Sequence, residues 1–208
     1  MDTTNNRRKK TDTACAGVSP ASCIGESHWS LFLDRDGVIN ERIPDSYIKD
    51  FKDFRFKKDF LGVFPKIARL FDYVFIVTNQ QGIGKGLMTI HDLEIVHNKM
   101  VEEINNLSGK IDKIYFCPHL KEENCRCRKP NPGMAYMAKN DFSAIDFKKS
   151  VLIGDSEGDI EFGKNVGMKT ILVKNDASKN IKADYSVNDF YEIENIIQRL
   201  LKSTGAVQ

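Results

Sequence analysis

The chain has 208 residues, of which 41% are hydrophobic and 29% are charged, as in ordinary globular proteins with a well-filled core. Its formal net charge is +2, from 31 basic and 29 acidic residues, so no overall field favours nucleic acid or an anionic membrane. No apolar run approaches the roughly 18 residues that span a bilayer. We therefore expect a cytoplasmic enzyme or binding domain.

Residues 1–28 differ in composition from the rest of the chain. They begin with a basic run, Arg7 to Lys10, and contain almost no large apolar side chain. The apolar stretch of a secretory signal is also missing. We predict a disordered tail at 1–28 followed by one domain at 29–203, and we assign no role to Cys15 or Cys23 in the tail.

The stretch from Ser30 to Asn40 combines a short apolar run with two carboxylates. Leu31–Leu33 has the length and composition of a buried strand, and it leads into Asp34, Asp36 and Gly37. Residues two apart on a strand face the same way, so the two carboxylates repel unless a cation or a shared proton lies between them. Alone, the pattern fits equally well an acidic turn, because Asp-Gly is common in turns.

The next segments alternate between helix and strand patterns. Residues 41–58 are polar and aromatic and suggest a hairpin or flap packed over something. Asp59 is a candidate N-cap for a helix that runs to about Phe71. The apolar run 73–77 predicts a strand buried on both faces, and it leads into Thr78–Gly86, whose glycines allow backbone N–H groups to approach an anion.

The same alternation continues to the end of the domain. We predict a helix from Thr89 or Asp92 to about Leu107, a strand at 111–116, a short helix near 134–139, and a strand at 150–153 that leads into Gly154–Asp159. A helix to about Val166, a strand at 169–173, an edge strand near Tyr185 and a helix at 190–201 follow. Strands that alternate with helices predict an α/β fold with a doubly wound, Rossmann-like parallel sheet.

Three cysteines and a histidine lie within eleven residues, at Cys117, His119, Cys125 and Cys127. Thiolate and imidazole are the preferred ligands of Zn²⁺, and a Cys₃His set forms a closed tetrahedral site. Disulfides are one alternative, but the chain shows no secretion signal and is typical of a cytosolic protein. A fortuitous clustering of cysteines is the other alternative. A closed site has no position for a substrate, so we predict a structural zinc that stiffens the loop leading to Arg128 and Lys129.

Four short motifs together are highly specific. Asp34–Gly37 reads D-x-D-G, Thr78 ends the second strand, Lys129 follows the cysteine loop, and Gly154–Asp159 reads G-D-x-x-x-D. Over roughly residues 30–175 the chain resembles the haloacid dehalogenase (HAD) superfamily of phosphohydrolases. Within it, D-R-D-G-V-I-N, V-T-N-Q-Q-G-I, C-R-C-R-K-P and N-P-G-M are similar to the branch that holds heptose 1,7-bisphosphate 7-phosphatase and histidinol-phosphate phosphatase.

The resemblance implies a covalent mechanism. Asp34 attacks phosphorus and forms an aspartyl-phosphate, while Asp36 acts first as acid and then as base. Mg²⁺ is held by the Asp34 side chain, the Asp36 carbonyl and Asp155. Thr78 and Lys129 hold the phosphoryl oxygens.

The resemblance also implies which groups surround the substrate. We expect Asn79, Gln80, Gln81 and Arg128 to contact it, with Arg128 positioned for a second phosphate. Asp159 is expected to orient Lys129 or the water shell of the metal, with a helix cap as the alternative. The short connections leave no room for a large cap domain, so the fold should be nearly capless.

The predicted partner is a small phosphorylated sugar. We favour removal of the 7-phosphate of D-glycero-D-manno-heptose 1,7-bisphosphate over the histidinol-phosphate alternative, because N-P-G-M and I-G-K-G are more like the heptose enzyme. A non-catalytic zinc-stabilised binding module is a further alternative, but it does not explain why the residue set is complete. An enzyme acting on nucleic-acid ends is another, but the near-neutral net charge and the absence of aromatic–basic interleaving around the site argue against it. We expect a monomer that binds neither nucleic acid nor membrane.

Overall fold

The computed structural model describes residues 29–43 and 46–203, so the predicted tail with Cys15 and Cys23 lies outside the described residues. Six parallel strands form one sheet in the order β3-β2-β1-β4-β5-β6. The strands are β1 (Ser30–Leu33), β2 (Tyr73–Asn79), β3 (Lys113–Cys117), β4 (Ser150–Gly154), β5 (Lys169–Val173) and β6 (Tyr185–Val187). The predicted doubly wound parallel sheet is confirmed.

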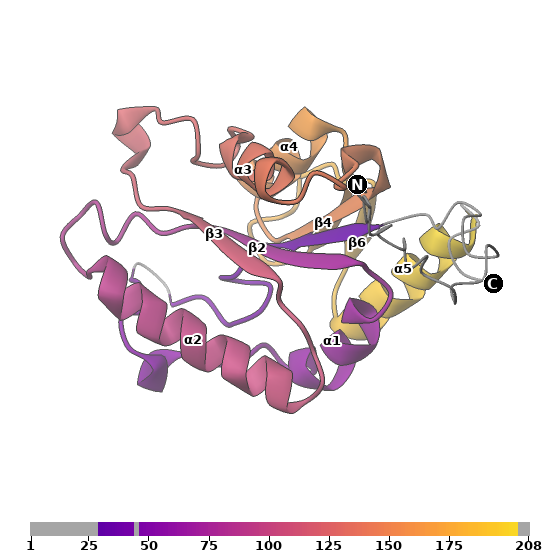
Figure 1. Cartoon of the computed structure of the whole chain (residues 1–208), viewed down its shortest axis with the longest axis horizontal. Helices are drawn as coiled ribbons and strands as arrows, with labels where there is room; N and C mark the ends of the chain where they lie inside the picture. The colour runs from indigo at the N-terminus through magenta and orange to yellow at the C-terminus, as the bar shows by residue number, and fades with distance from the viewer. Residues whose placement is uncertain (1–28, 44–45, 204–208) are drawn as a thin grey trace, which may run out of the picture.

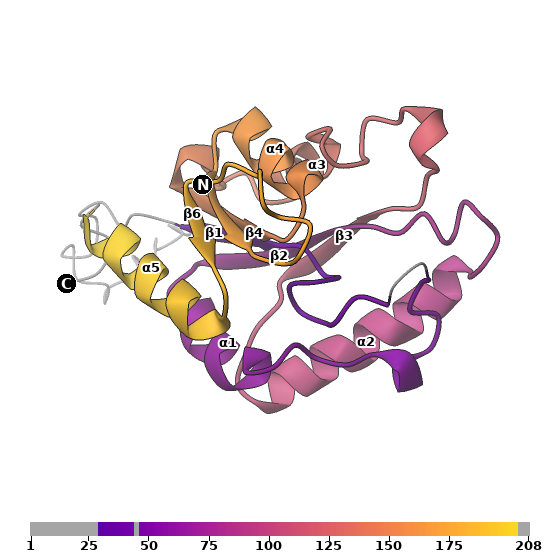
Figure 2. The same cartoon turned by 180° about the vertical axis from the view of Figure 1, so that it is seen from behind.

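Helices cover both faces of the sheet, as Figures 1 and 2 show from opposite sides. One face carries α1 (Phe60–Ala68), α2 (Ile90–Asn106) and α5 (Phe190–Ser203), and the other carries α3 (Gly133–Asp141) and α4 (Glu157–Val166). Leu31 and Leu33 of β1 belong to the core on the first face, whereas Phe32 belongs to the core on the second. A strand buried on both faces explains its continuous apolar sequence.

The register of the sheet brings three strand ends to one edge. Leu33 of β1 pairs with Ile76 of β2 and with Ile153 of β4, so the residues after each strand emerge together. The strand order also reverses between β1 and β4, since β2 and β3 lie on one side of β1 and β4 to β6 on the other. A crevice at the carboxyl ends of the strands is expected at this reversal.

Two helix starts test the capping predictions. Thr89 caps α2 with a full capping box, in which its hydroxyl accepts from the Asp92 N–H and the Asp92 side chain accepts from the Thr89 N–H. At α1 the predicted position is correct, since Asp59 is the N-cap residue, but it adopts φ 65° and its side chain makes no capping hydrogen bond. The helix also ends at Ala68, earlier than predicted.

The predicted flap after β1 is closed at its base by backbone pairing. Asn40 and Phe56 form an antiparallel bridge, and the Glu41 N–H donates to the Arg55 carbonyl at 2.8 Å. Within it lies a short 3-10 helix, Phe51–Asp53. The flap is therefore mounted on the core at both ends.

Within the described residues, no helix is both long and apolar enough to cross a membrane.

Candidate active site

A cavity of about 640 Å³ opens at the carboxyl ends of β1 and β2. Its wall combines these strand ends with the flap, the glycine-rich loop after β2 and the residues that follow the cysteine loop. Seven of the predicted site residues line it: Asp34, Asp36, Thr78, Asn79, Gln81, Arg128 and Lys129. Residues more than ninety positions apart in the sequence thus share one pocket.

Lys129 is buried at the centre of the site, with its ammonium group fully engaged. Its Nζ lies 2.7 Å from Asp34 Oδ1, 2.6 Å from Asp159 Oδ1 and 2.7 Å from the Val77 carbonyl oxygen. Burial alone would lower the pKa of Lys129, but the negative charges of Asp159 and Asp34 raise it above its ordinary value. The site therefore contains a fixed positive charge beside the candidate nucleophile.

Asp159 serves two purposes. Besides binding Lys129 through Oδ1, its Oδ2 accepts from the Ser156 N–H at 3.0 Å at the start of α4. The expected orienting role and the helix-cap alternative are thus both present in one side chain.

Three carboxylates lie buried together, two just after strands β1 and β4 and one in the first turn of α4. Asp34, Asp155 and Asp159 are each at most 4% exposed, and one oxygen of each lies within 4.8 Å of the others. Burial raises the pKa of Asp34 to about 7, and the nearby Asp159 charge adds to the effect. Burial likewise raises the pKa of Asp155 to about 6. Such a cluster favours a bound cation, which lowers both pKa values again.

Asp36 faces away from this cluster into a separate hydrogen-bond network. Its carboxylate accepts from Arg35 at 2.9 and 3.0 Å, from Asn40 at 2.9 Å and from Gln80 at 3.1 Å. Burial would raise the pKa of Asp36, but Arg35 and these hydrogen bonds hold it below its usual value. Arg35 is only 1% exposed, and its Nη1 lies 3.1 Å from Nε2 of His97 on α2.

The oxygen atoms proposed to bind magnesium are present, and a positively charged side chain already contacts two of them. Arg42 of the flap donates from Nε to the Asp36 carbonyl at 3.1 Å and from Nη2 to Asp155 Oδ1 at 2.7 Å. Carboxylate and carbonyl oxygens are the ligands that Mg²⁺ prefers. The guanidinium stands in for a positive ion at these two oxygens, so the residues fit such an ion.

Gly37 lets the backbone approach Asp155. It adopts φ 92°, and a Cβ at this position would lie 1.9 Å from Asp155 Oδ2. Only glycine fits this position, because both the conformation and the space exclude a side chain.

The three predicted amides after Thr78 all have structural partners. Asn79 brackets Lys129: its Oδ1 accepts from the Lys129 N–H at 3.1 Å, and its Nδ2 donates to the Lys129 carbonyl at 3.2 Å. Gln80 is 1% exposed and donates to Thr78 Oγ1 at 2.8 Å and to Asp36, so it lies behind the pocket wall instead of lining it. Gln81 does line the pocket, and it donates to the Tyr47 hydroxyl at 2.9 Å.

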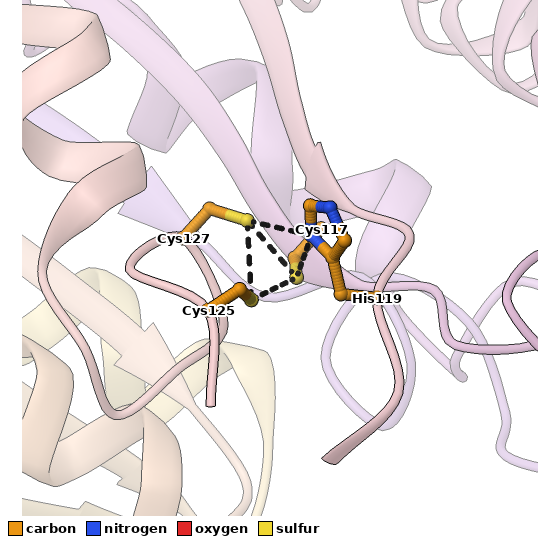
Figure 3. Close-up of side chains that lie close together, drawn as sticks. All are labelled: Cys117, His119, Cys125 and Cys127. Atoms are coloured by element: carbon orange, nitrogen blue, oxygen red, sulfur yellow. Dashed lines mark hydrogen bonds between the residues drawn. The ribbon is translucent and has the colours of Figure 1, made fainter. Parts of the chain in front are cut away.

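The cysteine loop folds around a common centre, shown in Figure 3. Sγ of Cys117, Cys125 and Cys127 and Nδ1 of His119 are separated by 3.2 to 3.5 Å in the five pairs that touch. These separations are far longer than the roughly 2.05 Å of a disulfide. They approach the roughly 3.8 Å edge of a tetrahedron with 2.3 Å Zn–S bonds. The donor set and its geometry fit a closed zinc site.

Sequence reasoning missed four side chains at this site. Arg42, Tyr47 and Lys85 line the pocket, and Lys85 Nζ lies 5.5 Å from the centre of the Tyr47 ring. Arg35 escaped notice although it stands between the two motif aspartates. Arg35 and Lys85 lie inside the sequence motifs, and that position could have identified them. The sequence pattern of the flap contains nothing that would identify Arg42.

Comparisons with known proteins find relatives of this chain in sequence and in structure. A family model described as HAD-hydrolase-like matches residues 126–194. D-glycero-alpha-D-manno-heptose-1,7-bisphosphate 7-phosphatase of Campylobacter jejuni is 42% identical over 154 residues, covering 72% of this chain and 84% of that protein. The D-glycero-beta-D-manno-heptose-1,7-bisphosphate 7-phosphatase of Helicobacter pylori is 34% identical over 171 residues, covering 81% and 97%.

A solved structure is similar over nearly its whole length. The D,D-heptose 1,7-bisphosphate phosphatase of B. bronchiseptica, complexed with magnesium and phosphate, matches with a TM-score of 0.73 and 27% identity. The match covers 84% of this chain and 99% of that one.

Proposed function

The chain belongs to the D-glycero-D-manno-heptose-1,7-bisphosphate 7-phosphatase family of HAD-like hydrolases, and we propose that it removes the 7-phosphate of this sugar bisphosphate. The observation that carries the proposal is the contact of Asp34 with Lys129 at 2.7 Å in a pocket that also holds Asp36 and Thr78. Such an arrangement pairs a carboxylate nucleophile with the groups needed to bind a phosphoryl group.

Asp34 is proposed as the nucleophile. Its carboxylate oxygen attacks phosphorus, the bond to the sugar oxygen breaks, and an aspartyl-phosphate forms. Lys129 holds a phosphoryl oxygen and offsets the negative charge that develops in the transition state, with the Thr78 hydroxyl as a second hydrogen-bond donor. Asn79 supports this step by fixing the Lys129 backbone on both sides.

Asp36 is proposed to move the protons. In the first step its carboxylic acid protonates the leaving sugar oxygen, and in the second its carboxylate takes a proton from the water that attacks the aspartyl-phosphate. Arg35, Asn40 and Gln80 hold the carboxylate in its network, so Asp36 must turn from these partners toward the leaving oxygen to act.

Two metals complete the proposal. The Asp34 and Asp155 side chains and the Asp36 carbonyl would hold Mg²⁺, which when bound supplies positive charge to the phosphoryl oxygens. Cys117, His119, Cys125 and Cys127 would hold a structural Zn²⁺ that fixes the loop before Arg128 and Lys129. Support comes from the donor sets described above and from the magnesium in the B. bronchiseptica phosphatase.

The outer pocket suits the second phosphate of a bisphosphate. Arg128 and Lys85 are cations on its wall, and the Tyr47 hydroxyl of the flap is a hydrogen-bonding group on the same wall. Gln81 lines the same wall through its contact with Tyr47. We propose that these groups select the bisphosphate.

We also propose that the protein acts as a monomer in the cytoplasm. In that compartment the cysteine thiolates of a zinc site stay reduced.

Phosphate release tests the proposal. The α and β anomers of heptose 1,7-bisphosphate, and histidinol phosphate, are compared by kcat/KM with Mg²⁺ present, and loss of the 7-phosphate is followed by ³¹P NMR. We expect a heptose anomer to be preferred at least tenfold over histidinol phosphate. Asp34→Asn should lower kcat by at least about 10³-fold, whereas Asp53→Asn on the exposed surface should leave it unchanged. A preference for histidinol phosphate, or an active Asp34→Asn protein, would contradict the proposal.

A further inference from the structure

Arg42 binds the two oxygens that a magnesium ion would need, although it belongs to the flap and not to the HAD motifs. Its guanidinium forms a fork across the Asp36 carbonyl, 3.1 Å from Nε, and Asp155 Oδ1, 2.7 Å from Nη2. The two bonds link residues 6 and 113 positions from Arg42 in the sequence. A single side chain of the flap thus pairs with the buried Asp155 carboxylate.

The remaining faces of Asp155 are closed. Its carboxylate is 3% exposed, and the Asn175 amide donates to Oδ2 at 3.2 Å. The Gly37 backbone packs against the same oxygen so closely that a Cβ would lie 1.9 Å from it. An incoming cation therefore reaches Asp155 through Oδ1, and Arg42 holds that oxygen.

Mg²⁺ and Arg42 cannot both keep their preferred geometry there. Mg²⁺ binds oxygens at about 2.0–2.1 Å in a near-octahedral shell, so an ion on both oxygens would lie where the guanidinium fork now lies. Two cations at such a separation also repel strongly in a buried site. Arg42 is free to leave, because its side chain is 52% exposed and lines the open pocket.

We propose that Arg42 is an intramolecular competitor for the magnesium ion, which binds by displacing its guanidinium from Asp155 and the Asp36 carbonyl. In the metal-free protein Arg42 keeps the buried Asp155 carboxylate paired, so the strand ends stay assembled without the ion. After displacement the guanidinium remains in the pocket as an additional cation for a phosphate. This inference rests on the metal site of the proposed function.

Calorimetric Mg²⁺ titration of the full chain tests the competition. The apparent dissociation constant of a site is raised by the inverse of the fraction of protein in which the site is free. An exposed or half-exposed ion pair is worth up to about 1 kcal/mol, which corresponds to roughly fivefold. We therefore expect Arg42→Met to bind Mg²⁺ about fivefold more tightly than wild type. Lys85→Met removes a cation from the same pocket wall without touching the donors, and it should change the constant less than twofold.

Two further measurements follow Arg42 itself. The Nε–Hε NMR signal of Arg42 is identified as the one that Arg42→Met abolishes. In wild type this signal should shift as Mg²⁺ is added, and the Mg²⁺ concentration at the midpoint of the shift should match the dissociation constant found by calorimetry. In EDTA Arg42→Met should melt below wild type, because Asp155 loses its cation, and saturating Mg²⁺ should close the gap. An unmoved signal, equal Mg²⁺ affinities, or an equal gain in Lys85→Met would each overturn the inference and leave the proposed function standing. Failure of wild type to bind Mg²⁺ would overturn both.

Discussion

His97 should make the folded protein sensitive to mild acid, although it lies outside the pocket. The imidazole is 6% exposed, and its Nε2 accepts a hydrogen bond from Arg35 Nη1 at 3.1 Å, so it must be neutral in the fold. Burial, together with the positive charge of Arg35, lowers the pKa of His97 to about 3 from its ordinary 6.5. In the unfolded chain the same imidazole accepts a proton below pH 6.5.

The size and sign of the effect follow from proton linkage. Because the folded-state pKa is the lower one, the contribution of His97 to stability is complete above pH 6.5 and is lost as the pH falls below it. A pH of 5 lies 1.5 units below the pKa of 6.5 that His97 has in the unfolded chain. At about 1.36 kcal/mol per unit, the free energy of unfolding is therefore lower by about 2 kcal/mol at pH 5 than at pH 8 through this group alone. Asp34 and Asp155, with folded pKa values of about 7 and 6, act in the opposite direction, so a variant comparison is needed.

Urea unfolding of wild type, His97→Gln and His91→Gln at pH 8 and pH 5 isolates the contribution. Glutamine keeps an oxygen that accepts from Arg35 but does not titrate, so the change in unfolding free energy between the two pH values should differ from wild type by about 2 kcal/mol. His91 lies on the same helix with its side chain 81% exposed, and its replacement should leave the change as in wild type. If the unfolding free energy of His97→Gln changes between pH 8 and pH 5 as much as that of wild type, the buried neutral imidazole does not cause the loss of stability in acid.

Three further changes probe the site and the metal loop. Gly37→Ala should cost more than about 2 kcal/mol in urea unfolding and weaken Mg²⁺ binding, because the new Cβ meets the Asp155 carboxylate at a positive φ. Asp159→Asn should cost about 3 kcal/mol, because Lys129 loses a buried partner at 2.6 Å; a change below 1 kcal/mol would count against this pairing. Mass spectrometry of metals should find one zinc per chain and much less in Cys127→Ser, with a lower melting temperature.

Most of the fold followed from local sequence patterns. The strands are continuous apolar runs because the sheet is covered on both faces, and the positions of β5 at Lys169–Val173 and of the Thr89 helix start agree with the prediction. At Asp59 the position of the N-cap agrees with the prediction, but the backbone adopts φ 65° and the side chain makes no capping hydrogen bond. Sequence spacing identifies a capping residue type but cannot fix that angle, which depends on how the flap joins α1.

The candidate site was predictable where residues sit in motifs and unpredictable where contacts are long-range. Asp34 and Thr78 follow from strand ends that a parallel sheet brings together. The Arg42–Asp155 and Arg35–His97 contacts join residues 113 and 62 positions apart, and they depend on the path of the flap and on the packing of α2. No spacing rule covers such contacts.

Within a few positions of the sequence, the flap contains both an aromatic anchor to the core and a residue that faces the pocket. Phe54 meets Phe56 edge to face with ring centres 5.0 Å apart, and Phe56 stacks on Phe60 at 5.9 Å. Phe60 in turn meets Phe190 of α5 edge to face at 5.1 Å. Tyr47, a few residues earlier, faces the pocket and belongs to neither core cluster. Pocket-facing residues that we propose to contact the substrate can therefore be exchanged while the aromatic anchor stays in place. Divergence of this family toward new phosphate esters has a ready route at Tyr47, since selectivity can change at this position while the nucleophile and the aromatic anchor stay the same.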